Sequence, residues 1–460
     1  MRPFLGNPTT NPYTDRGIEM DTRIPMRETI IIGFMLFALF FGAGNLVFPA
    51  MLGQQAGDQY WLANLGFLTT GVGLPIVATL AFGFSGSKSL LELASRVHPW
   101  FGLCYTAVLY LTIGPLFAMP RTGTVSYEIG LKPYIPPQYE AWGLAAFSGL
   151  FFGVTLLFSL NPAKIIEIVG KLLTPALLLL IAVLSIAALA SPLGSPQAPI
   201  GDFGTQAFFI GFREGYLTMD TLAAFVFGIL VIDVIQAKGA NRRRTMLTVC
   251  LQAALVSAIL LAAIYTALTY LGASSVAGFG LLRNGGEVLQ LATSHYFGAF
   301  GGLVLGVIVL LACLTTSIGL ATSCSSFFHT LFPNMSYKRI CIFLCAVSAL
   351  IANAGLEKLI SFSVPVLTIL YPLAIALIFL TFLHGFFRGR RGVYAGCLTL
   401  TFLVSLVSGL AGTPLRLERA DALFSQTLPF YDIGLGWFLP ACAGALLGYW
   451  LPWGGRAQRA

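Results

Sequence analysis

Residues 37–49 read FALFFGAGNLVFP, and this stretch decides the fold. Two glycines, Gly42 and Gly44, precede Asn45 and Pro49 in the middle of a long apolar run. A glycine in a helix interior is about 1 kcal/mol less favourable than an alanine. The pattern therefore predicts a helix that is interrupted near its middle. The alternative is a packing motif, because small residues let two helices come close together.

The composition places this stretch in a lipid bilayer. Of the 460 residues, 57% are hydrophobic and 10% are charged, whereas soluble proteins carry about 25% charged residues. An ordinary soluble enzyme, a disordered scaffold and a nucleic-acid-binding domain are thereby excluded. Because lipid offers the backbone no hydrogen-bond partners, we expect an all-α polytopic membrane protein. At about 20 residues a crossing, twelve transmembrane helices fit near 28–52, 61–84, 99–128, 140–159, 165–190, 215–236, 246–272, 298–330, 338–353, 358–383, 393–411 and 433–453.

The basic residues predict how the chain is oriented. Lysine and arginine concentrate in cytoplasmic loops of membrane proteins, and here they alternate from loop to loop. The net charge of +8 is therefore assigned to orientation and not to an anionic partner. We expect a multi-pass protein of the inner (cytoplasmic) membrane with both termini in the cytoplasm and no cleavable signal. The basic residues then placed inside are Arg2, Arg16, Arg23, Arg27, Lys88, Arg96, Lys164, Lys171, Lys238, Arg242, Arg243, Arg244, Lys338, Arg339, Arg388, Arg390, Arg391, Arg456 and Arg459.

A second anomaly lies in the sixth span. Asp220 is followed by an apolar run, and an acid at membrane depth costs about 2.5–3.5 kcal/mol unless it is paired, wetted or functional. The alternative is an interfacial position near Arg213 and Glu214. Spans one and six are related by a shift of five, and paired interruptions of this kind indicate inverted repeats around a midplane site. We therefore predict a five-plus-five inverted repeat with broken helices 1 and 6.

The eighth span carries neighbouring hydroxyl groups. Thr315 and Thr316 fall within a single turn. Such residues often form hydrogen bonds to their own helix, which is the structural interpretation. They also offer two neutral hard oxygens, which suit a desolvated monovalent cation such as sodium.

Together these segments resemble the branched-chain amino acid:cation symporter family, within the amino acid–polyamine–cation superfamily. The order and spacing of the segments fit throughout. The matching stretches are Leu36–Pro49, Gly66–Pro75, Ile113–Glu128, Gly215–Gly228 and Cys313–Gly319.

The resemblance implies the fold of sodium-coupled leucine transporters, with a sodium ion between the first and eighth helices. Carried over residue by residue, the ligands are the backbone carbonyls of Ala38, Phe41 and Ala312 and the hydroxyls of Thr315 and Thr316. A basic residue replaces a sodium on the fifth helix of proton-coupled relatives. The deeper part of that helix is uncharged here, which favours sodium over protons.

The resemblance also implies a substrate site. The substrate carboxylate would meet the N–H groups around Ala43 and Gly44, and Asn45 matches a position that holds a second sodium in some relatives. Tyr110 corresponds to a third-helix segment that faces the site. Asp220 would receive the substrate ammonium or carry a proton, and the sequence does not choose between these roles.

Other residues near these motifs are open to two interpretations. The pocket for the substrate side chain should be apolar and is expected to include Phe40, Phe225 or Phe227, and of these we select Phe40 and Phe225. Arg121 and Glu128 lie seven apart on one helix face, and a structural role, pairing with other spans, is favoured over a functional one.

The predicted function is sodium-coupled symport of leucine, isoleucine and valine by alternating access, with no cofactor besides the coupling ion. The alternatives are proton coupling, or another small apolar or hydroxyl amino acid as substrate. An enzyme is disfavoured because none of the four histidines lies mid-membrane and no catalytic motif is present. A channel would need a continuous polar stripe. The oligomeric state is not predicted. The expected parts are a cytoplasmic tail (1–27), two five-helix repeats (28–190 and 191–383), and two further helices with the C-terminal tail (384–460).

Overall fold

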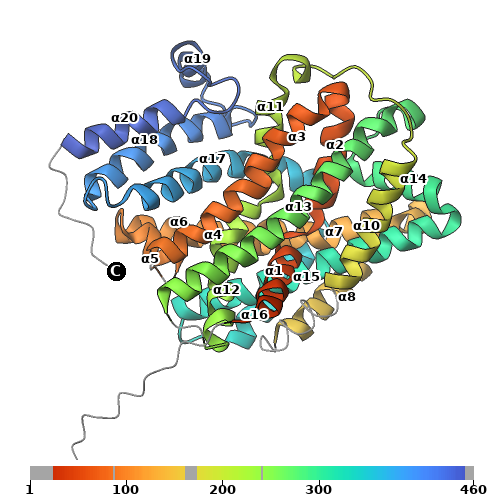
Figure 1. Ribbon diagram of the computed structural model, residues 1–460, viewed down its shortest axis with the longest axis horizontal. Coiled ribbons are helices and arrows are strands. Elements are labelled where there is room, and N and C mark those ends of the chain that lie inside the picture. The colour runs from red at the N-terminus through yellow and green to blue at the C-terminus, as the bar shows by residue number, and fades with distance from the viewer. Residues whose placement is uncertain (1–23, 86, 88, 161–173, 240–241, 451–460) are drawn as a thin grey trace, which may run out of the picture.

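The chain folds into a bundle of helices. The computed structural model describes residues 24–85, 87, 89–160, 174–239 and 242–450 (Figure 1), and every regular element within them is a helix. The α-helices are α1 (Met26–Phe40), α2 (Ala43–Ala56), α3 (Tyr60–Leu68), α4 (Leu74–Ser85), α5 (Leu90–Ser95), α6 (Pro99–Leu111), α7 (Ala118–Gly130), α8 (Glu140–Ser159), α10 (Thr174–Ala190), α11 (Phe203–Glu214), α12 (Asp220–Ala237), α13 (Arg243–Phe279), α14 (Gly285–Phe297), α15 (Gly301–Leu331), α16 (Tyr337–Ala352), α17 (Leu356–Leu383), α18 (Arg391–Leu410), α19 (Glu418–Thr427) and α20 (Phe438–Trp450).

The helices are those of a multi-pass membrane protein. Eight segments of the described chain are long and apolar enough to cross a membrane, and two shorter apolar helices, 177–190 and 438–450, accompany them. The predicted count of twelve crossings stays a prediction. The start of the fifth predicted span and nearly all of the N-terminal tail lie outside the described residues.

Helical structure also appears where no span was predicted. The sixth span was expected to start at residue 215, but α11 already begins at Phe203. Gln206, Arg213 and Glu214 within α11 lower its hydropathy, so a search for apolar runs misses it. Short helices also occupy connections: α14 begins after Asn284, whose side chain accepts a hydrogen bond from the Glu287 N–H at 3.1 Å and so caps the helix.

The third predicted span, 99–128, is kinked. A π-helical turn at Thr112–Leu116 separates α6 from α7, and Gly114 there has non-helical angles (φ −84°, ψ −120°). Pro115 lacks an N–H and its ring clashes with the preceding turn, which explains a kink at this point. The sequence analysis predicted one continuous span here, and the structure adds the kink.

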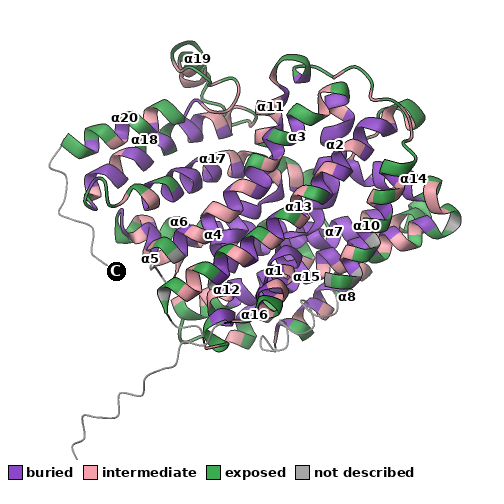
Figure 2. Ribbon diagram, in the orientation of Figure 1, coloured by how far each residue is buried: buried purple, intermediate pink, exposed green. Residues whose placement is uncertain are grey.

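The interrupted helices lie in the interior of the bundle. Helices α1, α13 and α15 overlap at the centre of the view, whereas α18 and α20 lie at one edge (Figure 1). Burial follows this arrangement, because buried residues are continuous through the central helices and exposed ones dominate the outer faces of α8 and α20 (Figure 2). Helices α2 and α13 pack so closely that the backbone leaves no room for a Cβ at Gly53 or Gly272. The fold therefore holds the two interruptions inside a tightly packed frame.

Candidate functional site

The first interruption lies at the glycine-rich stretch, as predicted. Helix α1 ends at Phe40 and α2 begins at Ala43. The Asn45 side chain reaches back to cap α2, since its Oδ1 accepts a hydrogen bond from the Gly42 N–H at 3.1 Å. A Cβ at Gly42 would lie 2.9 Å from Thr316 Oγ1 of α15. A larger residue at position 42 would therefore require Thr316 or the backbone to shift.

The second interruption lies at the start of α12. Helix α11 ends at Glu214, a 3₁₀ turn (η7) covers Gly215–Thr218, and Met219 has a left-handed backbone (φ 64°). Asp220 is the first residue of α12. A helix N-terminus carries partial positive charge, so the carboxylate stands where the backbone favours an anion.

One hydrogen-bonded cluster joins the two interruptions. Asn45 Nδ2 donates to Asp220 Oδ2 at 2.7 Å, and the Tyr265 hydroxyl of α13 donates to the same oxygen at 2.9 Å. Asn45 Nδ2 also contacts the Tyr265 hydroxyl. Asp220 is 2% exposed, so its carboxylate is enclosed by protein, and its depth in the membrane stays a prediction. Sequence analysis did not single out Tyr265, which lies within an ordinary apolar run.

Arg121 approaches the same place from α7. Its side chain is 5% exposed, and Nη1 donates to the Leu217 carbonyl of η7 at 2.8 Å. The guanidinium carbon lies 5.3 Å from the centre of the Phe48 ring, above its face. Glu128 does not accompany it, because Lys132, in the 3₁₀ turn after α7, donates to that carboxylate at 2.9 Å. Of the two residues, Arg121 is the one that contacts another span.

The predicted sodium ligands converge between α1 and α15. Thr315 Oγ1 lies 3.1 Å from the Ala38 carbonyl oxygen and 2.9 Å from that of Ala312. Thr316 Oγ1 lies 3.4 Å from the Ala38 oxygen and 3.1 Å from that of Leu39. Four of the five expected ligand residues thus bring oxygens together from two helices. Phe41, the fifth, lies at the interruption itself, and its ring stacks on that of Phe37 with centroids 5.1 Å apart.

This oxygen cluster suits a small hard cation without any acidic ligand. Both hydroxyls are buried and donate to carbonyl oxygens near the end of α1, where the chain leaves the helix. Among the described residues, no group of three or more His, Cys, Asp or Glu side chains gathers where it would hold a metal ion. The oxygens of this cluster are all neutral, whereas calcium and magnesium sites usually include carboxylates.

The aromatic residues divide into two groups. The rings of Phe40 and Phe227 meet with centroids 5.9 Å apart, close to the oxygen cluster on α1. Phe225 instead packs edge-on against Phe82 of α4 at 5.8 Å. These contacts favour Phe227 over Phe225 for an apolar pocket beside Phe40.

Tyr110 lies apart from the Asn45–Asp220 cluster. Its ring stacks on Phe327 at 4.0 Å, and it lines a cavity of about 360 Å³ that also contains Asp233 of α12. A second cavity, of about 380 Å³, is lined by Glu214, Tyr216 and Leu217 at the other end of the sixth helix. The cluster of Asn45, Asp220 and Tyr265 thus lies between two cavities along the sixth predicted span. Tyr110 lines one of these cavities.

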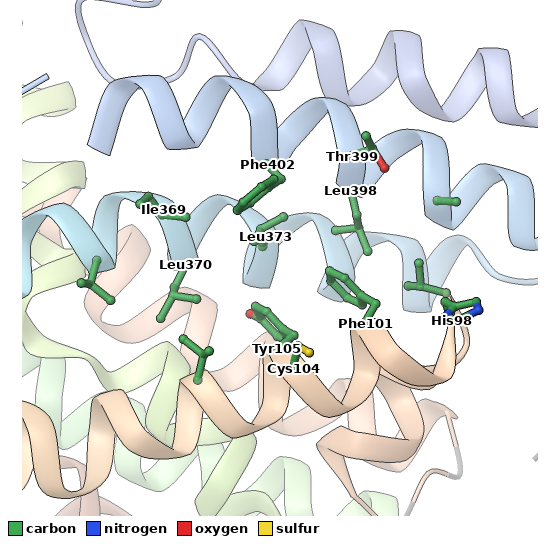
Figure 3. Close-up of a pocket in the computed structure, with 14 residues that line it drawn as sticks. His98, Phe101, Cys104, Tyr105, Ile369, Leu370, Leu373, Leu398, Thr399 and Phe402 are labelled. Atoms are coloured by element: carbon green, nitrogen blue, oxygen red, sulfur yellow. The ribbon is translucent and has the colours of Figure 1, made fainter. Parts of the chain in front are cut away.

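The cavity drawn in Figure 3 is distinct from this site. It has a volume of about 570 Å³ and lies between α6, α17 and α18, where its labelled side chains include Phe101, Tyr105, Leu373 and Phe402. None of the predicted site residues lines it. Its lining is almost entirely apolar, as expected where helices of a membrane protein meet lipid-facing surface.

The fold is that of a membrane transporter with interrupted helices. A solved nucleobase-cation-symport-1 family transporter with bromovinylhydantoin bound superimposes with a TM-score of 0.59 over 92% of this chain and 91% of that one. The two sequences are 16% identical, so the likeness concerns the fold alone.

The sequence is similar to known transport proteins over nearly its whole length. The profile of the branched-chain amino acid transport protein family matches residues 25–454. The branched-chain amino acid permease BrnQ of Bacillus subtilis (strain 168) is 54% identical over 430 residues, covering 94% of this chain and 98% of that protein. The permease BraB of the same organism is 45% identical, covering 94% and 96%. The chain belongs to the branched-chain amino acid transport protein family, and it is a transport protein rather than an enzyme.

Proposed function

We propose that the chain carries leucine, isoleucine and valine into the cell by symport with sodium. The observation that carries this proposal is the bond between Asn45 and Asp220, which joins two interrupted helices inside the bundle. An amino acid at this place meets the free N–H groups of α2 and the carboxylate of α12. These two features complement the two charges of its backbone.

The ion is assigned to the oxygen cluster between α1 and α15. Ala38 and Ala312 contribute carbonyls, Thr315 and Thr316 contribute hydroxyls, and Phe41 contributes a carbonyl from the interruption. In the absence of an ion the hydroxyls donate to the carbonyls; sodium would turn them so that all five oxygens face it. The end of α1 then becomes ordered by the ion, and the neighbouring substrate site becomes ordered with it.

The substrate is assigned to the space beside this ion. Asp220 receives the substrate ammonium, the N–H groups of Ala43 and Gly44 face the carboxylate, and Phe40 contacts the aliphatic side chain. The cavities on either side of the cluster, one lined by Leu217 and one by Asp233, support alternating access, in which the site opens first to one and then to the other.

The membrane arrangement extends this proposal. We infer twelve crossings, with two five-helix repeats at 28–190 and 191–383 and both termini in the cytoplasm. An ion pair of 2.6 Å between Glu28 and Lys238 supports it, because it places the start of α1 and the end of α12 on the same side. This side is the one that the basic residues mark as inside.

The test is uptake of radiolabelled leucine by the purified protein in proteoliposomes. An inward sodium gradient and an inward proton gradient are imposed separately, at equal membrane potential. Uptake above the level of empty vesicles with the sodium gradient alone supports the proposal. Uptake that needs only the proton gradient would assign coupling to the buried carboxylate of Asp220 instead, and absence of uptake under both gradients contradicts the transport of leucine.

A further inference from the structure

Arg121 is a buried cation, and most of its N–H donors have no hydrogen-bond partner among the described residues. In the described part of the chain, the bond from Nη1 to the Leu217 carbonyl is the one hydrogen bond of this guanidinium. Arginine has five N–H donors in a fork that matches a carboxylate. A charge that is 95% removed from solvent costs several kcal/mol unless a partner or a ligand compensates it. A single backbone carbonyl is a poor match for such a residue.

The guanidinium stands over the first turn of α2. A Cβ at Gly44 would lie 3.0 Å from Arg121 Nη2 and 2.9 Å from a ring carbon of Phe48. Nη2 of Arg121 therefore lies against the backbone of Gly44. The N–H groups at this end of α2 have no partners within the helix. Donors from the backbone and from Arg121 thus lie side by side at the start of α2.

Asp220 lies near Arg121 without forming an ion pair with it. Their charges interact electrostatically, yet among the described residues no contact of 4.0 Å or less joins Arg121 to an acid. Asp220 instead accepts hydrogen bonds from Asn45 and Tyr265. The two opposite charges are thus near each other but unpaired, and together they complement the two charges of an amino acid.

We propose that the Arg121 guanidinium binds the α-carboxylate of the transported amino acid, together with the N–H groups of Ala43 and Gly44. This inference rests on the proposed function and adds a second charged contact between the protein and the substrate. Arg121 makes a free carboxylate a requirement for binding, and Asp220 makes the ammonium a requirement. The Leu217 bond keeps the guanidinium in place and links substrate binding to η7, which lies between the two halves of the sixth helix.

The experiment pairs a change in the protein with a change in the ligand. Binding of leucine and of leucinol, which has a hydroxymethyl group in place of the carboxylate, is measured by competition against radiolabelled leucine in detergent. The parent is expected to bind leucine at least about tenfold more tightly than leucinol, because a hydrogen bond to a charged group is worth about a tenfold to a hundredfold change in affinity. For Arg121→Gln, the affinity for leucine should fall by a similar factor and that for leucinol by much less. The ratio of the two affinities then falls to the smaller preference that the N–H groups of Ala43 and Gly44 supply.

Two further variants separate recognition from folding. Arg121→Lys keeps the charge, so it should retain part of the preference for leucine. Arg96→Gln removes a second buried guanidinium, which donates to the Ser85 carbonyl at 3.0 Å and to Ser87 Oγ at 3.1 Å away from the interruptions. It should leave the leucine-to-leucinol ratio unchanged even if the melting temperature falls.

The outcomes are distinct. A loss of leucine and leucinol affinity by the same factor in Arg121→Gln would make Arg121 a purely structural residue and overturn the inference. Equal binding of the two ligands by the parent would overturn it as well, while leaving transport of leucine intact. A parent that binds none of the three aliphatic amino acids contradicts the proposed function itself, and the inference falls with it.

Discussion

The side-chain amide of Asn45 and the carboxylate of Asp220 are 175 residues apart in the chain and 2.7 Å apart in space. Each residue belongs to the first turn of the helix that follows an interruption. The bond therefore connects the two places where the bundle departs from regular helix. Asn45 also caps α2, because its Oδ1 accepts a hydrogen bond from the Gly42 N–H. One side chain thus sets both the local geometry of α2 and its link to α12.

Replacing Asn45 by alanine should therefore weaken substrate binding as well as stability. Loss of buried hydrogen bonds costs about 1–3 kcal/mol, so we expect the affinity for leucine to fall by about tenfold or more. The matched control is Asn64→Ala, which removes another buried bridge between helices, to Thr266 at 2.9 Å. Both variants should lower the melting temperature, but only Asn45→Ala should lower affinity. Equal affinities in the two variants would contradict the role of Asn45.

Asp220→Asn should insert normally and lose most uptake. Asparagine keeps an oxygen that accepts from Asn45 and Tyr265 but removes the negative charge that we assign to the substrate ammonium. Competition by 4-methylpentanoate, which lacks the ammonium, should change far less than competition by leucine. Asp202→Asn, at an exposed position just before α11, is the control. Uptake kinetics that match the parent at every pH from 5 to 8 would reduce Asp220 to a structural residue.

Thr315→Val should weaken sodium binding and substrate binding together. Valine keeps the shape of the side chain and removes one oxygen, and linkage requires the same coupling factor to appear in both affinities. Thr315→Ser keeps the oxygen and should be far milder. Leucine binding is measured against sodium concentration, with Thr381→Val as the control, since Thr381 is buried and bonds only to its own helix at 2.7 Å. If valine and serine at 315 behave alike, the ion site is misassigned.

Gly42→Ala should destabilise the protein and impair transport. The new Cβ would lie 2.9 Å from Thr316 Oγ1, and overpacking of this kind costs about 1–3 kcal/mol. Gly153→Ala is the control, because no atom lies within 4 Å of a Cβ on that face of α8, and alanine is the better helix former by about 1 kcal/mol. We expect thermal unfolding to show a lower melting temperature for the first variant and an unchanged or higher one for the second.

The orientation is tested by reporters at two positions. A cytoplasm-active reporter fused after Ala460 should be active, and one inserted after Asp58 should be inactive, because the connection around Asp58 lacks lysine and arginine. A reporter after Ala460 that reads as outside would contradict the predicted orientation, and together with an outside reading at Asp58 it would also contradict the even number of crossings.

Local chemistry explains why the sequence predicts the interruptions. Gly42, Gly44, Asn45 and Pro49 lie within one short stretch, so their effect on a helix can be judged without knowledge of the fold. Asp220 stands out in the same way against the apolar run that follows it. The predicted helix ends were less accurate where polar residues dilute the pattern, as in α11.

The partners of these residues could not be predicted locally. Tyr265 has apolar neighbours in sequence, and nothing there indicates that its hydroxyl binds a carboxylate 45 residues away. Arg121 is visible as a charge within a span, but its contacts with Leu217 and Phe48 depend on how three helices pack. Phe225 and Phe227 differ by two positions on one helix, and only packing shows that one faces α4 and the other Phe40.

The bond between Asn45 and Asp220 also fastens α2 to α12. If the bundle opens during transport, we expect these two half-helices to move as one body. The segments beside them are Phe41–Gly42, and the 3₁₀ turn Gly215–Thr218 with the left-handed Met219. We expect backbone rotation to concentrate in these two segments. Helices α1 and α11 leave the fastened pair from them, so each can change its angle while the pair keeps its place.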